Sequence, residues 1–194
     1  MNKLSIFASM MMMMCLPMMA QKNGSKAQVK PDPNFQIYLC FGQSNMEGNA
    51  AIEDIDRIGV NPRFMAMYAV DDEKAGWKKG QWHTAVPPQA RPSTGLTPVD
   101  YFGRKMVDNL PDSIKVGTIT VAVGGASIDL FDKRTCKAYL KKQPDWMKNF
   151  ASQYNGNPYA RLIELAKIAQ KQGVIKGILL HQGERSEERR VGKE

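Results

Sequence analysis

The sequence is poor in the residues that cross-link small proteins or hold metal ions. Its 194 residues include three cysteines, none of them in a CxxC pair, and only two histidines. Three cysteines cannot form a disulfide framework, and without paired cysteines we expect no structural metal. The fold must therefore rest on an apolar core. A chain that is 43% hydrophobic and 24% charged can build such a core as one domain.

The chain also lacks a concentrated basic surface, although its formal net charge is +8. The cations are scattered, and the folded part has no cluster denser than adjacent pairs such as Lys141 with Lys142. Nucleic-acid binding usually needs a basic face with interleaved aromatic side chains. We therefore expect a solvated surface and no nucleic-acid partner.

The N-terminus has the pattern of a targeting segment. Residues 1–20 combine Lys3 with an apolar run and end at the small residue Ala20, which predicts a secretory signal peptide. The run is short for a membrane span, so a retained anchor or a lipid attached at Cys15 is the lesser alternative. We expect a secreted or periplasmic protein without stable membrane association, and a linker over residues 21–34.

The last ten residues fit nothing that precedes them. Residues 185–194 read RSEERRVGKE and have no apolar periodicity. The decapeptide resembles the translation of a sequencing adaptor, so we expect a non-native tail after Glu184. A genuine charged tail is the alternative. The predicted domain then spans residues 35–184, incomplete at its C-terminus.

Within that domain, short apolar runs alternate with amphipathic segments. A polar stretch, Asp71–Pro98, reads as a long surface loop, and the segment after Gly125 is mixed. The alternation implies right-handed crossovers and hence a three-layer α/β/α sandwich with a parallel, flavodoxin-like sheet. The expected strands are Phe35–Phe41, Arg63–Val70, Ile114–Val123 and Ile175–Leu180, and the expected helices are Pro98–Leu110 and Pro158–Gln172.

Three polar motifs follow three of these strands: GQSNMEG at 42–48, GGAS at 124–127 and HQGE at 181–184. Active sites of parallel sheets lie beyond the carboxyl ends of the strands. Ser44 is the natural nucleophile there, although an N-cap serine would occupy the same place. The Ser44 N–H, the Gly125 N–H and the Gln182 amide would together form a three-donor oxyanion hole. Tight turns and strand-end hydrogen bonds are the alternative for the glycines and for Gln182.

These motifs, in this order, resemble the SGNH-hydrolase superfamily, in particular its sialate O-acetylesterase and acetylxylan esterase branch (carbohydrate esterase family 6). The resemblance implies a serine esterase that removes acetyl groups from carbohydrates without a cofactor. It implies that Ser44 is the nucleophile, and that Gln182 and one glycine of the Gly124–Gly125 pair are oxyanion donors. Glu184 matches an acid that orients the catalytic histidine in some members of this branch, whereas in others an aspartate three residues before the histidine has that role. We expect Asn45 and Trp82 to contact the substrate.

The chain departs from this family at the catalytic base. The DxxH element should follow HQGE, but no such motif is present. The two histidines are His83, in the expected loop, and His181, which matches a motif position other than the base. His83 is either that base or an ordinary loop residue. A Cys40–Cys136 bridge is possible, whereas Cys40 lies within a buried run and is not expected to be a nucleophile.

Two rival functions remain at this stage. A non-catalytic carbohydrate-binding domain would keep the fold without the base. A lipid esterase would need an apolar lid, for which the 71–98 stretch is too polar. Aromatic side chains suit sugar stacking or core packing equally well, and the candidates are Trp77, Trp82, Tyr101 and Trp146.

Overall fold

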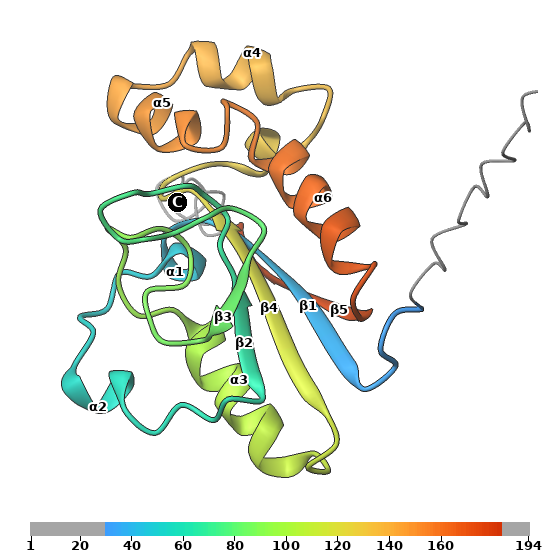
Figure 1. Ribbon diagram of the computed structural model, residues 1–194. Coiled ribbons are helices and arrows are strands. Elements are labelled where there is room, and N and C mark those ends of the chain that lie inside the picture. Colours follow the sequence, from blue (N-terminus) through green and yellow to red (C-terminus); the bar gives the residue numbers. More distant parts are fainter. Residues whose placement is uncertain (1–29, 184–194) are drawn as a thin grey trace, which may run out of the picture.

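The computed structural model describes residues 30–183 (Figure 1). The predicted signal peptide, most of the predicted linker, Glu184 and the predicted tail 185–194 lie outside this range. In chain order the elements are β1 (Phe35–Gly42), α1 (Ser44–Glu47), α2 (Asp54–Arg57), β2 (Phe64–Met67), β3 (Trp82–Thr84), α3 (Pro98–Asn109), β4 (Lys115–Ala122), the 3₁₀ helix η1 (Ile128–Phe131), α4 (Cys136–Lys141), α5 (Asp145–Ser152), α6 (Pro158–Ala169) and β5 (Val174–His181).

The described strands form one sheet in the order β3-β2-β4-β1-β5. β1 pairs in parallel with β4 and β5, and β2 pairs in parallel with β4. Only β3 is antiparallel, along β2. The predicted parallel sheet is confirmed. The expectation of an uninterrupted loop over 71–98 is wrong, because three residues of that stretch add the edge strand β3 and Gln89, Ala90 and Arg91 are buried.

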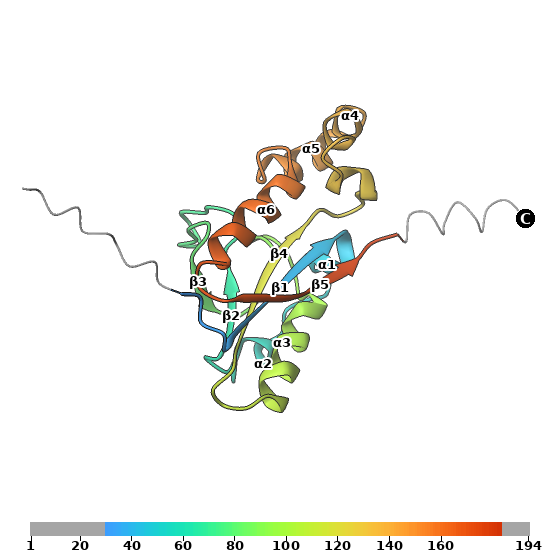
Figure 2. The same cartoon turned by 90° about the vertical axis from the view of Figure 1, so that its right-hand side faces the viewer.

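Helices cover both faces of the sheet, as the three-layer prediction requires. α3 packs on β4 and β2, while α6 packs on β4, β1 and β5. Figure 2 views the sheet nearly edge-on and shows α3 and α6 on opposite sides of it. β4 lies between these two layers and is buried along seven of its eight residues. That burial explains its almost continuous apolar sequence.

The two long helices begin at the signals present in the sequence. The Thr97 side chain accepts the Val99 N–H, and the Asp100 carboxylate accepts the Thr97 N–H at 2.9 Å. Asn157 accepts the Ala160 N–H at 2.9 Å at the start of α6. Such caps each contribute about 1 kcal/mol to stability. The Thr97 hydroxyl also donates to the Met46 carbonyl at 3.0 Å, which ties the start of α3 to α1.

The mixed segment after Gly125 folds into η1, α4 and α5. These short helices lie together at the top of Figure 1, beyond the ends of the strands. The Cys40–Cys136 bridge that the sequence left possible is not formed: both thiols are free and buried. Cys40 packs with Val99 on the α3 side of the sheet, whereas Cys136 belongs to the core cluster that includes Leu165 of α6. Burial raises the pKa of the Cys40 thiol to about 12, so it stays protonated.

Candidate active site

The carboxyl ends of β1, β4 and β5 meet at one rim of the sheet. Gly42 is paired with Ala122 of β4 on one side and with His181 of β5 on the other. Two backbone bonds continue the pairing past the strands: Val123 N–H to the Gly42 carbonyl and Gln43 N–H to the His181 carbonyl, both at 3.1 Å. The three polar motifs therefore start from adjacent points.

Ser44 is the first residue of α1 and is partly exposed at this rim. The N-cap position belongs to Gln43, whose side chain makes no capping hydrogen bond. The alternative interpretation of Ser44 as an N-cap serine is therefore not supported. The helix that starts at Ser44 contacts both β1 and β4, and its residue Met46 is buried against Cys40 and Ala122.

The Gly124–Gly125 loop lies directly beside Ser44. A Cβ atom on Gly124 would be 3.9 Å from the Ser44 Cβ and 2.7 Å from Glu47 Oε2. Gly125 has a φ of +66°, a left-handed backbone conformation that residues other than glycine rarely adopt. A Cβ there would also lie 3.0 Å from the Trp146 ring. Both positions favour glycine because the loop passes closely between Ser44 and Trp146.

Gln182 reaches the same loop from the end of β5. Its amide nitrogen donates to the Ala126 carbonyl at 3.1 Å, and its oxygen accepts the Gly183 N–H at 2.8 Å. An amide nitrogen carries two hydrogens, so one bond to Ala126 leaves the second as a possible donor to a ligand. The structure therefore brings Ser44, Gly125 and Gln182 together at one rim.

A hollow of about 370 Å³ lies beside α1 on the α3 side of the rim. Asn45, the residue after Ser44, lines it together with Tyr101 of α3 and His181 of β5. The Tyr101 hydroxyl donates to Asp56 at 2.7 Å, which holds the ring in place while 46% of the residue stays exposed. Asn45 therefore places this hollow one residue along α1 from Ser44.

Comparison with known families shows which family the chain belongs to. Residues 34–193 match the family described as carbohydrate esterase, sialic acid-specific acetylesterase. The chain belongs to this carbohydrate esterase family. The match covers nearly all of the folded part and confirms the resemblance found in the three motifs.

Two solved structures are similar to this esterase domain. One is a protein from Arabidopsis thaliana, with 19% sequence identity and a TM-score of 0.53; the match covers 79% of this chain and 58% of that one. The other is a carbohydrate acetylesterase from Xanthomonas citri, with 20% identity and a TM-score of 0.46; the match covers 76% of this chain and 32% of that one. The first likeness supports the fold. The chain spans little more than half the length of that first protein.

His83 and Trp82 lie far from the rim of the esterase domain. Both belong to β3, and β2 and β4 separate that strand from β1, at about 4.8 Å per strand spacing. His83 stacks on Tyr68 with ring centroids 3.9 Å apart, and burial lowers its pKa. Trp82 packs edge-on against Phe35 at the start of β1. The structure brings neither side chain to Ser44, and Glu184, the expected orienting acid, lies outside the described residues.

One pair of charged residues at this rim was not expected from the sequence. Glu47, three residues after Ser44, forms an ion pair with Arg91, and the two side chains are only 7% and 2% exposed. The second Glu47 oxygen accepts the Gly124 N–H at 3.1 Å. No local pattern marks Arg91 as buried, because it follows a polar, proline-rich stretch. The position of Glu47 inside the serine motif was the one available signal.

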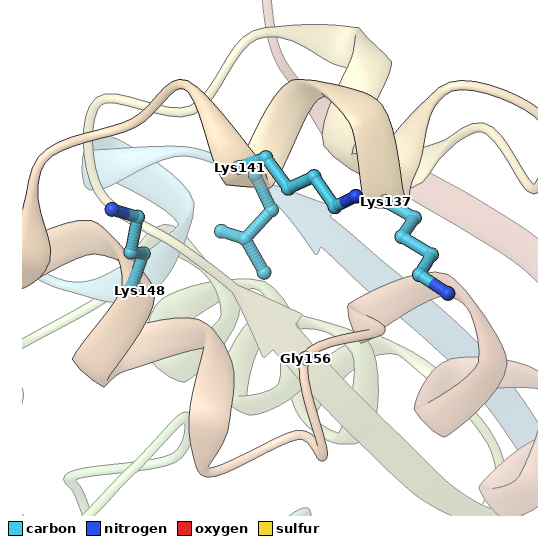
Figure 3. Close-up of a pocket in the computed structure, with 5 residues that line it drawn as sticks. Lys137, Lys141, Lys148 and Gly156 are labelled. Carbon is cyan, nitrogen blue, oxygen red and sulfur yellow. The ribbon is translucent and has the colours of Figure 1, made fainter.

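A second hollow, of about 480 Å³, lies between α4, α5 and the turn before α6. Lys137, Lys141 and Lys148 line it together with Leu140 and Gly156. Figure 3 shows that the amines of Lys137 and Lys148 point away from each other and do not converge on one point. This hollow therefore does not have the geometry of an anion site.

Two further properties concern the described part of the esterase domain as a whole. Between residues 30 and 183, none of the helices has the length and apolar character needed to cross a membrane. In the same range, no three His, Cys, Asp or Glu side chains are grouped as metal ligands.

Proposed function

We propose that this domain is a serine esterase that removes acetyl groups from carbohydrate hydroxyls, of the sialate O-acetylesterase or acetylxylan esterase type. The observation that carries the proposal is the meeting of Ser44, Gly125 and Gln182 at the ends of three adjacent parallel strands. Membership of a carbohydrate esterase family supports the same chemistry. A nucleophile beside several convergent N–H donors suits acyl transfer.

In the first half-reaction, Ser44 Oγ attacks the carbonyl carbon of the acetyl ester and gives its proton to a general base. The carbonyl oxygen becomes an oxyanion that accepts hydrogen bonds from the N–H groups of Ser44 and Gly125 and from the Gln182 amide. The sugar oxygen then leaves and takes up the proton that the base received. The product is a sugar hydroxyl and an acetyl-serine.

In the second half-reaction, water attacks the acetyl-serine while the same base accepts a proton from it. The bond between the acetyl carbon and Ser44 Oγ then breaks, the base returns its proton to Ser44 Oγ, and acetic acid leaves and ionises to acetate. We propose that the base is a histidine of a DxxH element, which the family resemblance places after HQGE. The position of His83 on β3, which β2 and β4 separate from β1, argues against that residue as the base.

The walls of the rim suit a sugar ring next to the acetyl group. The hollow lined by Asn45, Tyr101 and His181 offers an amide, a ring face and an imidazole. On the other side of Ser44, Trp146 lies against Gly125 and is 48% exposed. Aromatic faces with nearby polar groups are common at ligand sites. We propose that Asn45 and Tyr101 contact the sugar, and that Trp146 forms the opposite wall.

The test is the Ser44→Ala variant of the full-length protein, assayed on p-nitrophenyl acetate and on acetylated oligosaccharides. Loss of the nucleophile should lower kcat by about four to six orders of magnitude. Ser152→Ala is the matched control, because Ser152 lies on α5 and its hydroxyl donates to the Asn149 carbonyl. More than a few per cent residual activity in Ser44→Ala would remove Ser44 from the mechanism. If the wild-type protein bound the oligosaccharide without any turnover, the result would favour a carbohydrate-recognition domain.

A further inference from the structure

The buried ion pair between Glu47 and Arg91 needs an explanation beyond stability. Both side chains are almost fully removed from water, and Arg91 as a whole is 1% exposed. Removing two charges from water costs about as much as their attraction returns, so a buried ion pair adds little net stability. The pair nevertheless lies at the base of the rim that carries Ser44. Its contacts indicate what it does there.

The two oxygens of Glu47 have different partners. Oε1 accepts from Arg91 Nη2, and Oε2 accepts the Gly124 N–H at 3.1 Å. Glu47 and Ser44 belong to the same short helix, and Gly124 directly precedes Gly125. The Glu47 carboxylate therefore connects α1, which carries Ser44, to the Gly124–Gly125 loop. Because the Gly124 N–H is bound to Glu47, Gly125 is the glycine of the pair to assign as oxyanion donor.

Arg91 is also connected to the Gly124–Gly125 loop through two aromatic side chains. Its guanidinium group lies over the ring of Phe150, 4.4 Å from the centroid. Phe150 contacts Trp146 edge to face at 5.8 Å, and Trp146 packs against Gly125. Within the described residues, Arg91 Nε and Nη1 have no hydrogen-bond partner. The charge of Arg91 is therefore balanced mainly by Glu47 and by the face of Phe150.

The charge on Glu47 depends on this arrangement. Burial raises the pKa of Glu47, while the Arg91 charge and the Gly124 N–H oppose that rise. Loss of either partner would favour the neutral acid. Loss of the carboxylate would leave a cation buried without a counter-charge.

We propose that Glu47 and Arg91 are positioning residues of the esterase. They hold the Gly124–Gly125 loop against α1, so that the N–H groups of Ser44 and Gly125 face the same oxyanion, and they do not contact the substrate. The proposal rests on the proposed function, because an oxyanion hole has meaning only for acyl transfer. A hole of this kind works only when its donors lie 2.7–3.1 Å from the developing oxyanion.

The first test is Glu47→Gln in the full-length enzyme. Arg91 and the Gly124 N–H are bound by different oxygens of Glu47, and in glutamine one of these two positions carries an NH2 group, which donates and cannot accept. We expect kcat on p-nitrophenyl acetate to fall about 10- to 100-fold with KM changed less than about threefold, the effect of a misplaced oxyanion donor. A wild-type kcat would overturn the proposal.

The control is a second arginine–glutamate pair, away from the rim. Arg161 and Glu164 of α6 form an ion pair at 3.0 Å, with the Arg161 side chain 5% exposed. Glu164→Gln should lower the unfolding midpoint without changing kcat. Glu47→Gln combined with Arg91→Met removes the uncompensated cation, so it should be more stable than Glu47→Gln alone while kcat stays low. Recovery of kcat together with stability would show a structural role only.

A measurement without turnover separates this proposal from the proposed function. Hydrogen exchange of the Gly124 amide, followed by NMR, should be slow in the wild-type protein and clearly faster in Glu47→Gln. Unchanged exchange would overturn the positioning role even if the protein is an esterase. Full activity of Ser44→Ala would refute the proposed function, whatever the exchange of Gly124 shows.

Discussion

Gly42 and His181 are so close that a Cβ atom on Gly42 would lie 2.0 Å from the His181 carbonyl oxygen. That oxygen accepts the Gln43 N–H at 3.1 Å, so the contact joins the end of β1 to the end of β5. Ser44 follows two residues after Gly42, and Gln182 directly follows His181. The distance between nucleophile and amide donor is therefore set by a backbone contact that only glycine allows.

Gly42→Ala should consequently destabilise the domain and displace the rim. The new methyl group would collide with backbone, which cannot move aside as a flexible side chain can. We expect a loss of about 3 kcal/mol in the free energy of unfolding, measured by urea denaturation. Gly59→Ala is the control: nothing lies within 4 Å of a Cβ there, and only its φ of +63° adds a cost of about 1 kcal/mol. Equal losses in the two variants would contradict the role of this contact.

Much of this rim follows from residue patterns alone. Ser44, Gly125 and Gln182 were predicted because each follows an expected strand, and parallel strands bring their carboxyl ends to one edge. The order of the strands was not predictable, since no local pattern states that β4 lies between β2 and β1. β3 was missed because three residues are too short to show an alternation.

The charged residues of the rim show a second limit of sequence reasoning. Glu47 and Arg91 lie 44 positions apart, and a charged residue in a sequence gives no sign that it will be buried. Only the folded chain pairs them. The sequence also gives no sign of the contact that Trp82 makes. This expected substrate contact packs its ring against Phe35, at the end of β1 opposite to Ser44.

Gln182→Ala should lower turnover without weakening substrate binding. The amide already donates to Ala126 at 3.1 Å, which orients it beside the Gly125 loop. Loss of one oxyanion donor costs about 100- to 1,000-fold in kcat, because the interaction strengthens only as charge develops on the oxygen. Steady-state kinetics on p-nitrophenyl acetate would measure both constants. A variant with altered KM and normal kcat would show that Gln182 binds substrate and is not an oxyanion donor.

Stability should fall as the pH rises from about 4 to about 6, through the titration of Asp100. Burial raises the pKa of Asp100 from 3.8 to about 6, despite hydrogen bonds from Thr97 and Gln89. The folded state therefore holds this proton more tightly than the unfolded state, and the stabilisation present below pH 4 is lost as Asp100 ionises. A pKa shift of this size corresponds to a change of roughly 3 kcal/mol in the free energy of unfolding.

Asp100→Asn isolates this contribution, because asparagine does not titrate. The free energy of unfolding, measured by denaturant titration at several pH values, should decline less steeply between pH 4 and pH 6 in the variant than in the wild-type protein. Parallel curves for the two proteins would mean that Asp100 keeps an ordinary pKa. Asp112→Asn serves as the matched control, because the Asp112 side chain is fully exposed.

The outer edge of β5 should govern the solubility of the domain. β5 is the last strand of the sheet within residues 30–183, and its exposed fractions alternate along the strand. Ile178 and Leu180 are 62% and 54% exposed and lie on the same side of the strand. Exposed apolar side chains on an edge strand invite pairing with a second molecule.

Replacing these two residues by lysine should therefore reduce self-association. We expect Ile178→Lys combined with Leu180→Lys to raise the concentration at which light scattering begins, with little change in the unfolding midpoint, since exposed substitutions usually cost under about 0.5 kcal/mol each. Leu165→Lys, at a fully buried position on α6, is the contrasting control and should prevent folding. If the double variant also failed to fold, Ile178 and Leu180 would have to be covered in solution, and the edge would then be an interface that the protein needs for stability.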